Sequence, residues 1–197
     1  MPSYPYSEGN ASLISSLKLQ PHPEGGFFAE TVRTEQKIAS EFADGKERNL
    51  ATQIYYLLTP DSPKGKMHTD VSIAQTFHTL HAGRALYTLV KPLPPNSPSG
   101  AEPEIKHVVM GSDSSKGEVR QLFVEGGWWK ASELPEEDLK AGEGDKEHTG
   151  CLISEVVVPG FDFEDHKFLS KQELLSLFNG NEQAEGVKKL LPYVRED

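Results

Sequence analysis

Short runs of alternating hydrophobic and polar residues fill the middle of this chain, from residue 27 to residue 158. The side chains of a β-strand point alternately to its two faces, so a period of two predicts strands. Clusters of Gly, Pro, Asn and Asp separate the runs, as turns do. The predicted strands cover residues 27–34, 51–59, 74–81, 85–90, 105–110, 119–124, 128–131 and 151–158.

Helical spacing is confined to the two ends of the chain. Apolar residues recur every three or four positions after Asn10, a suitable N-cap, which predicts a helix over residues 11–19. Two further helices are predicted within residues 170–191, over 171–178 and 184–191. Many short strands with a few peripheral helices predict an all-β sandwich or barrel, formed by one domain over residues 1–197.

Two other stretches are predicted to be surface loops. Residues 91–104 are rich in proline, and residues 132–150 are acidic and rich in glycine. Neither is long enough for a second domain.

The charge balance narrows the classes of partner. The chain has 30 acidic and 20 basic residues, a formal net charge of -10. Binding to nucleic acid or to an anionic membrane needs a positive field, so we expect neither partner. The N-terminus lacks the features of a secretory signal, and the single cysteine, Cys151, fits a reducing compartment. We therefore expect a cytoplasmic protein.

The loop Pro21-His22-Pro23-Glu24-Gly25-Gly26 precedes the first long strand. Proline fixes the backbone angle φ, whereas glycine allows angles and close approaches that a Cβ forbids. Such a loop can hold His22 and Glu24 in one place, against a ligand or against the neighbouring sheet.

Four motifs in order resemble the Cupin-5 family, a branch of the cupin superfamily described as a domain of unknown function. They are the P-H-P-E-G-G loop, the segment I-Y-Y-L-L-T-P at 54–60, the turn at Gly83, and I-S-E-V-V-V-P-G-F-D-F-E-D at 153–165. The resemblance covers roughly residues 13–168. It implies a double-stranded β-helix, or jelly-roll barrel, commonly a homodimer, with a ligand cavity inside. It implies no particular reaction.

Metal-binding cupins resemble one another in an H-x-H pair, an E-x6-G motif and a later P-x-G-x2-H motif. The matching positions of this chain hold Lys66, His68, Thr76 and Lys130, so His68 alone remains of the four ligands. Two lysines would oppose a divalent metal, and threonine is a weak ligand. We therefore expect no metal at the usual positions and no other cofactor.

His78 shares a strand face with Thr76 and is therefore expected to face the cavity. It can be a core histidine bonded to Thr76 or to the backbone, or an acid–base group. We also expect it to come within reach of His68 across adjacent strands, and with Glu24 these two histidines would form an alternative metal site. The remaining histidines downstream, His81, His107, His148 and His166, are given no role.

Without a metal, the cavity can move protons. Histidine is the usual general base, lysine and arginine hold anions, and tyrosine is an acid. Metal-free cupins resembling the sugar-nucleotide epimerases use such a set, which is an analogy of fold. Arg33 is placed on the strand face of Phe27 and Ala29, with the inward face left open. The candidate catalytic residues are His68 and His78, and the candidate substrate-binding residues are Glu24, Arg33, Tyr56, Lys66, Thr76, Tyr87 and Lys130.

The leading functional hypothesis is an isomerase, epimerase or lyase that acts on a small polar molecule, such as a sugar nucleotide or a hydroxy or keto acid. One alternative is a non-catalytic protein that binds a small molecule. Another is a metal-dependent oxygenase, which requires His68, His78 and Glu24 to converge on one ion.

Overall fold

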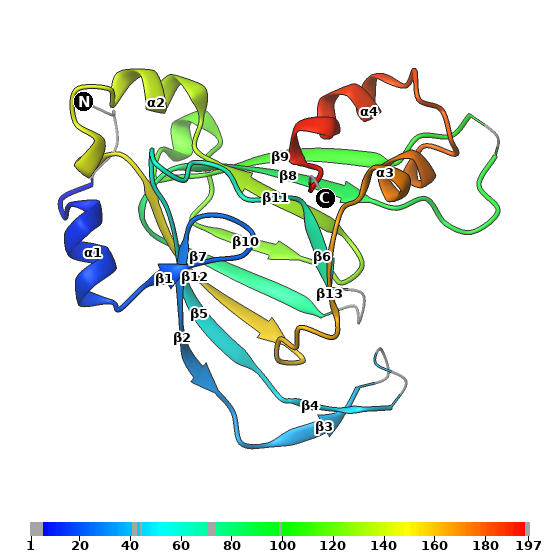
Figure 1. Cartoon of the computed structure of the whole chain (residues 1–197), viewed down its shortest axis with the longest axis horizontal. Helices are drawn as coiled ribbons and strands as arrows, with labels where there is room; N and C mark the ends of the chain where they lie inside the picture. The colour runs from blue at the N-terminus through cyan, green and yellow to red at the C-terminus, as the bar shows by residue number, and fades with distance from the viewer. Residues whose placement is uncertain (1–5, 41–42, 44, 71–73, 99, 196–197) are drawn as a thin grey trace.

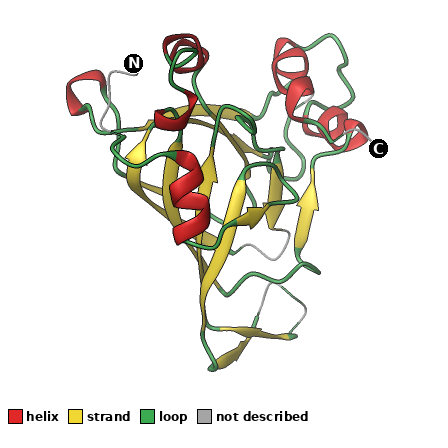
Figure 2. Cartoon of the chain, turned by 60° about the vertical axis from the view of Figure 1, so that its left-hand side comes forward, coloured by secondary structure: helices red, strands yellow, loops and turns green. Residues whose placement is uncertain are grey.

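Two antiparallel sheets face each other in the computed structural model, which describes residues 6–40, 43, 45–70, 74–98 and 100–195 (Figure 1). The six-stranded sheet has the order β1-β2-β5-β12-β7-β10, and the five-stranded sheet has the order β13-β6-β11-β8-β9. Strands close in sequence alternate between the sheets, which is the jelly-roll arrangement. A small hairpin, β3-β4, extends away from the helices (Figure 2).

The strands begin and end close to their predicted positions. Those of the six-stranded sheet are β1 (Gln20–Pro21), β2 (Phe27–Arg33), β5 (Thr52–Leu58), β12 (Cys151–Val158), β7 (Gln75–Gly83) and β10 (Gln121–Val124). Those of the five-stranded sheet are β13 (His166–Phe168), β6 (His68–Asp70), β11 (Trp129–Glu133), β8 (Ala85–Lys91) and β9 (Glu104–Met110). The hairpin consists of β3 (Lys37–Ala39) and β4 (Glu47–Asn49). The predicted all-β jelly roll is confirmed, although the alternation missed the short strands β1, β3, β4, β6 and β13.

The helices cover the outer faces of the two sheets. Helix α1 (Asn10–Ser16) packs on the six-stranded sheet through an apolar cluster that includes Leu13, Leu57 and Leu152. Helices α3 (Lys171–Leu177) and α4 (Glu185–Leu190) lie on the five-stranded sheet. A capping box at Ser170 fixes the start of α3. No helix among the described residues has the length and apolar character that a membrane crossing needs.

The acidic segment 132–150, predicted to be a loop, contains helix α2 (Glu136–Ala141). Its Asp138 is buried and accepts two hydrogen bonds from the guanidinium of Arg84, each 3.0 Å long. Arg84 also pairs with Glu118 and Glu137. These contacts with Arg84 hold helix α2 of the acidic segment against the rest of the protein.

The turn between β7 and β8 depends on Gly83. Its φ is +81°, and a Cβ at this position would collide with the backbone carbonyl of Gly150. Only glycine meets both conditions. The turn sends the chain from the six-stranded sheet to the five-stranded sheet, so that the inner faces of both enclose the apolar core around Tyr87 and Ile153.

Candidate functional site

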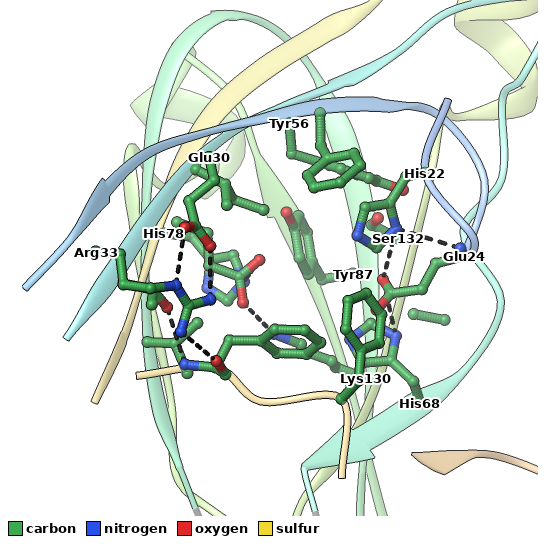
Figure 3. Close-up of a pocket in the computed structure, with 18 residues that line it drawn as sticks. His22, Glu24, Glu30, Arg33, Tyr56, His68, His78, Tyr87, Lys130 and Ser132 are labelled. Carbon is green, nitrogen blue, oxygen red and sulfur yellow. Dashed lines mark hydrogen bonds and ion pairs between the residues drawn. The ribbon is translucent and has the colours of Figure 1, made fainter. Parts of the chain in front are cut away.

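A cavity of about 100 Å³ lies between the two sheets (Figure 3). Its apolar lining comes from Phe28, Ile54, Ala131, Val157, Phe161 and Phe163. Its polar lining comes from His22, Glu24, Glu30, Arg33, Thr52, Tyr56, His68, His78, Tyr87, Lys130, Ser132 and Glu155. This volume is below the roughly 150 Å³ of a cavity that holds a benzene ring, so the enclosed space suits a small molecule with few non-hydrogen atoms.

The P-H-P-E-G-G loop closes on itself at one end of the cavity. The His22 amide donates to the Gly26 carbonyl at 3.0 Å, and the Gly25 amide donates to the His22 carbonyl at 3.0 Å. Gly25 has a φ of +112°, and a Cβ there would collide with the Lys64 carbonyl. The prolines and glycines thus fix both polar side chains of the loop, and both line the cavity.

Glu24 is the centre of the first polar cluster. Its Oε2 lies 3.1 Å from His68 Nδ1 and 3.8 Å from His22 Nδ1, and its Oε1 lies 2.7 Å from His166 Nε2. The rings of His68 and His166 are stacked, with centroids 5.2 Å apart. Three imidazoles from three separate segments therefore surround one carboxylate.

Burial and neighbours set the ionisation of this cluster. Burial alone would raise the pKa of Glu24, but the imidazoles of His68, His166 and His22 outweigh it and lower the pKa to about 2. Burial lowers the pKa of His68 to about 4 in spite of the neighbouring Glu24. At neutral pH, Glu24 is an anion and His68 is uncharged.

Glu155 is the centre of the second polar cluster, in the middle of β12. Its Oε1 forms a short ion pair with Lys130 Nζ, and its Oε2 lies 3.4 Å from His78 Nε2. The other ring nitrogen of His78 lies 3.3 Å from the Leu122 carbonyl oxygen. Burial would raise the pKa of Glu155, but Lys130 and then His78 hold the pKa well below its usual value. Here a lysine cation neutralises the carboxylate.

Two tyrosines line the cavity and differ in their hydrogen bonding. The Tyr56 hydroxyl donates to the Gly25 carbonyl at 2.9 Å. The Tyr87 hydroxyl forms no hydrogen bond with any described residue, and the Tyr87 ring packs edge-on against His78 with centroids 5.2 Å apart. Burial raises the pKa of Tyr87 well above its usual value, so this phenol carries its proton at neutral pH.

A β-bulge brings Arg33 to the cavity rim. Glu30 pairs with Ile54, but Val32 pairs with Gln53 and Arg33 with Thr52, so one residue is skipped. The bulge moves Arg33 from the predicted face of Phe27 and Ala29 to the face of Phe28 and Glu30. Its guanidinium donates to both Glu30 carboxylate oxygens, at 2.9 and 2.7 Å.

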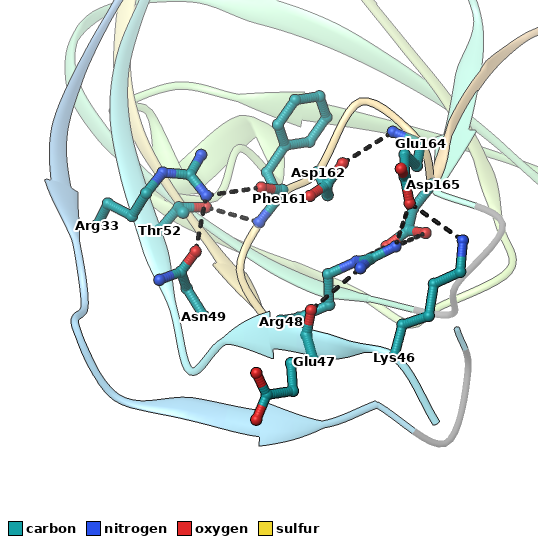
Figure 4. Close-up of polar contacts among 10 residues, drawn as sticks. All are labelled: Arg33, Lys46, Glu47, Arg48, Asn49, Thr52, Phe161, Asp162, Glu164 and Asp165. Carbon is teal, nitrogen blue, oxygen red and sulfur yellow. Dashed lines mark hydrogen bonds and ion pairs between the residues drawn. The ribbon is translucent and has the colours of Figure 1, made fainter. Parts of the chain in front are cut away.

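A polar network holds the segment after β12 over the rim (Figure 4). Arg33 donates to the Phe161 carbonyl at 3.1 Å, and Arg48 binds both carboxylate oxygens of Asp165 at 2.8 and 2.9 Å. Arg48 is buried, so this two-point contact is shielded from water. It fixes the residue directly before His166.

The structure separates the predicted site residues into three groups. His68, His78, Glu24, Arg33, Tyr56, Tyr87 and Lys130 line the cavity. Thr76 is buried beside it, with its Oγ1 3.5 Å from Lys130 Nζ. The Lys66 side chain is exposed and does not line the cavity; its backbone carbonyl instead lies 3.1 Å from His68 Nδ1.

The expected pairing of His68 with His78 across adjacent strands is wrong. β6 and β7 belong to different sheets, and each histidine contacts its own glutamate. The second histidine beside Glu24 is His166, which sequence analysis left without a role. The usual metal positions do not fit a metal either, because the Lys130 ammonium stands beside Thr76.

Sequence analysis also missed Glu155. A carboxylate within the apolar run I-S-E-V-V-V was the available signal, because a charge in a buried strand needs a partner. His166 offered no such signal, since its position depends on the pairing of β13 with the distant β6.

Comparison with known proteins agrees with this architecture. The family model Cupin_5, described as the Cupin superfamily (DUF985), matches residues 11–169. The chain belongs to this Cupin_5 family. The match confirms the resemblance seen in the four motifs.

Relatives of this Cupin_5 protein cover most of its length. The uncharacterised Saccharomyces cerevisiae protein YML079W is 40% identical over 181 residues, which are 87% of this chain and 81% of the yeast protein. A hypothetical protein from Leishmania major has a TM-score of 0.71 at 29% identity, over 92% of this chain and 97% of that one. Protein SO0799 from Shewanella oneidensis shares the fold, with a TM-score of 0.70 at 22% identity over 96% of this chain and 99% of that one.

Proposed function

We propose that this cupin binds a small polar molecule in its cavity and moves a proton on it, as an isomerase, epimerase or lyase does. The observation that carries the proposal is the Tyr87 hydroxyl. It is protonated, faces the cavity and has no hydrogen-bond partner among the described residues. A bound carbonyl oxygen would supply the missing acceptor.

Glu155 is the proposed base, and Lys130 controls it. In the free protein, Lys130 is the strongest of the influences that lower the pKa of Glu155. A substrate oxygen that draws the ammonium away would leave burial dominant, and burial raises the pKa of a carboxylate. Substrate binding thus makes Glu155 a better proton acceptor.

The proton steps balance within these groups. Glu155 takes a proton from the carbon beside the substrate carbonyl, and Tyr87 gives its own proton to the carbonyl oxygen, which forms an enol. An isomerisation is complete when the Glu155 carboxyl gives its proton to the former carbonyl carbon and the hydroxyl on the neighbouring carbon gives its proton to the Tyr87 phenolate. His78 holds Glu155 in place through Nε2 while its Nδ1 faces the Leu122 carbonyl, so it is a positioning residue.

The charges that line the cavity limit the substrate. Carboxylates of Glu24, Glu30 and Glu155 outnumber the cations of Arg33 and Lys130. Such a lining does not attract a multiply charged phosphate. We infer a hydroxy-carbonyl compound with at most one negative charge. A homodimer and a cytoplasmic location stay predictions.

Hydrogen–deuterium exchange tests this function. The protein is incubated in D₂O with a panel of hydroxy and keto acids, free sugars and sugar nucleotides, and NMR follows exchange at carbon. We expect exchange beside the carbonyl of at least one hydroxy-carbonyl compound, and at least about 100-fold slower exchange in Tyr87→Phe, since general acids contribute about 10²–10⁴-fold.

Tyr55→Phe is the control, because Tyr55 lies on β5 of the six-stranded sheet and contacts His81 on the outer face, away from the cavity. It should exchange at the wild-type rate. Equal exchange rates in Tyr87→Phe and wild type would refute the proposed acid. Binding without any exchange would favour the non-catalytic alternative.

A further inference from the structure

The Glu24 cluster has the composition of a metal site. Glu24, His68 and His166 each offer one ligand atom, and these atoms all lie within 4.8 Å of one another. The three residues come from the P-H-P-E-G-G loop, β6 and β13, and their side chains are 11, 10 and 7% exposed. Folding therefore brings two imidazoles and one carboxylate together away from bulk water.

No lysine or arginine among the described residues forms an ion pair with Glu24. Among the described residues, every hydrogen bond and ion pair of its side chain is made to an imidazole. Buried charges are normally paired with an opposite charge or coordinate a metal. The nearby ammonium of Lys130 is already neutralised by Glu155 and so opposes a cation at Glu24 less.

We propose that Glu24, His68 and His166 bind a divalent transition-metal ion. Two imidazoles and one carboxylate suit Zn²⁺, Fe²⁺ and Co²⁺, and three protein ligands leave positions open for water or a substrate. The site shares only His68 with the four positions at which metal-binding cupins resemble one another.

The surroundings hold the three residues in place. The Lys66 carbonyl oxygen and Glu24 Oε2 both lie 3.1 Å from His68 Nδ1, so two contacts orient this ring. The Lys66 amide donates to the Glu24 carbonyl at 2.7 Å. Arg48 anchors Asp165 next to His166, and the His166 ring packs edge-on against Phe168 with centroids 4.7 Å apart.

Cobalt titration tests the site directly. The untagged full-length chain is freed of metal with a chelator and titrated with Co²⁺, while visible absorption and calorimetry follow binding. We expect one Co²⁺ per chain, with the d–d bands of a nitrogen- and oxygen-ligated ion. In Glu24→Gln and His166→Phe the dissociation constant should rise at least about tenfold, the lower limit for changes in residues that merely support a metal ligand.

His166→Phe removes the ligand nitrogen but keeps an aromatic ring beside Phe161 and Phe168, so it is the variant designed to fold normally, and circular dichroism checks this. His81→Gln is the matched control, because His81 is exposed on the outer face of β7. It should bind like wild type. Failure of the wild-type protein to bind Co²⁺, or unchanged affinity in His166→Phe, would overturn the proposal. The titration contains no substrate, so its outcome is independent of the proposed proton transfer.

Discussion

Glu24 and Glu155 line the same cavity, but their surroundings stabilise the two carboxylates in different ways. Glu155 has an ammonium ion and an imidazole as partners, whereas Glu24 has imidazoles alone. Both carboxylates are ionised at neutral pH, because their neighbours outweigh the effect of burial on the pKa.

This difference separates two kinds of chemistry within one small space. The Lys130–Glu155 pair is internally neutral, and a substrate can rearrange it by attracting the lysine. The Glu24 cluster is a set of ligand atoms around an anion, and a cation can complete it. Ion-pair rearrangement and cation binding can therefore occupy neighbouring parts of the cavity, and variants in each part should have distinguishable effects.

The largest effect is expected from Lys130→Met, which leaves the Glu155 carboxylate buried without its cation. Breaking a buried ion pair on one side costs about 3–5 kcal/mol. The free energy of unfolding, measured by denaturant titration at neutral pH, should fall by that amount. The double variant Lys130→Met/Glu155→Gln removes both charges and should recover most of the loss. A double variant no more stable than Lys130→Met would show that the lysine acts through packing.

A smaller effect is expected from Glu24→Gln, measured in the presence of a chelator. The amide oxygen can still accept the hydrogen bond from His166 Nε2, but the charge on the acceptor is lost. Hydrogen bonds to charged groups are worth about 1.5–3 kcal/mol, so the free energy of unfolding should fall by no more than that range. Glu8→Gln is the control, because it makes the same change of side chain at an exposed position, and its free energy of unfolding should be nearly that of wild type. If Glu24→Gln lowers the free energy of unfolding as much as Lys130→Met does, the two carboxylates are not stabilised in different ways.

Local pattern predicted the sheets well because each long strand buries one face. In β7, Thr76 and His78 are buried while Gln75, Phe77 and Thr79 are exposed, as alternation requires. The strands that pattern missed are two or three residues long, too short for a period of two to be visible. Their positions depend on pairing with distant segments.

The candidate site was predicted less completely for the same physical reason. The face assigned to Arg33 was wrong because a bulge of one residue reverses the orientation of everything after it. The meeting of His68 with His166 follows from the pairing of Phe168 with His68, which lie 100 positions apart in the sequence. Strand alternation identified inward residues, but long-range pairing decided which of them touch.

The smallest effect on stability is expected from Arg33→Gln, at the exposed rim. The side chains of Arg33 and Glu30 are 40% and 36% exposed, so water screens their ion pair, unlike the pairs inside the cavity. Exposed ion pairs contribute about 0–1 kcal/mol, and the free energy of unfolding should change within that range.

The same variant should still affect the cavity, because Arg33 also donates to Asn49 Oδ1 at 3.0 Å and to the Phe161 carbonyl. Without these bonds, the segment bearing Phe161 should exchange its amide hydrogens faster, while the amides of β12 keep their protection. Thr31→Val is the control, since its hydroxyl donates to the Gln53 carbonyl on the same pair of strands without reaching that segment. Faster exchange at Phe161 with little loss of stability would show that the rim arginine orders the cavity entrance, whereas a loss above about 1 kcal/mol would place Arg33 with the buried ion pairs.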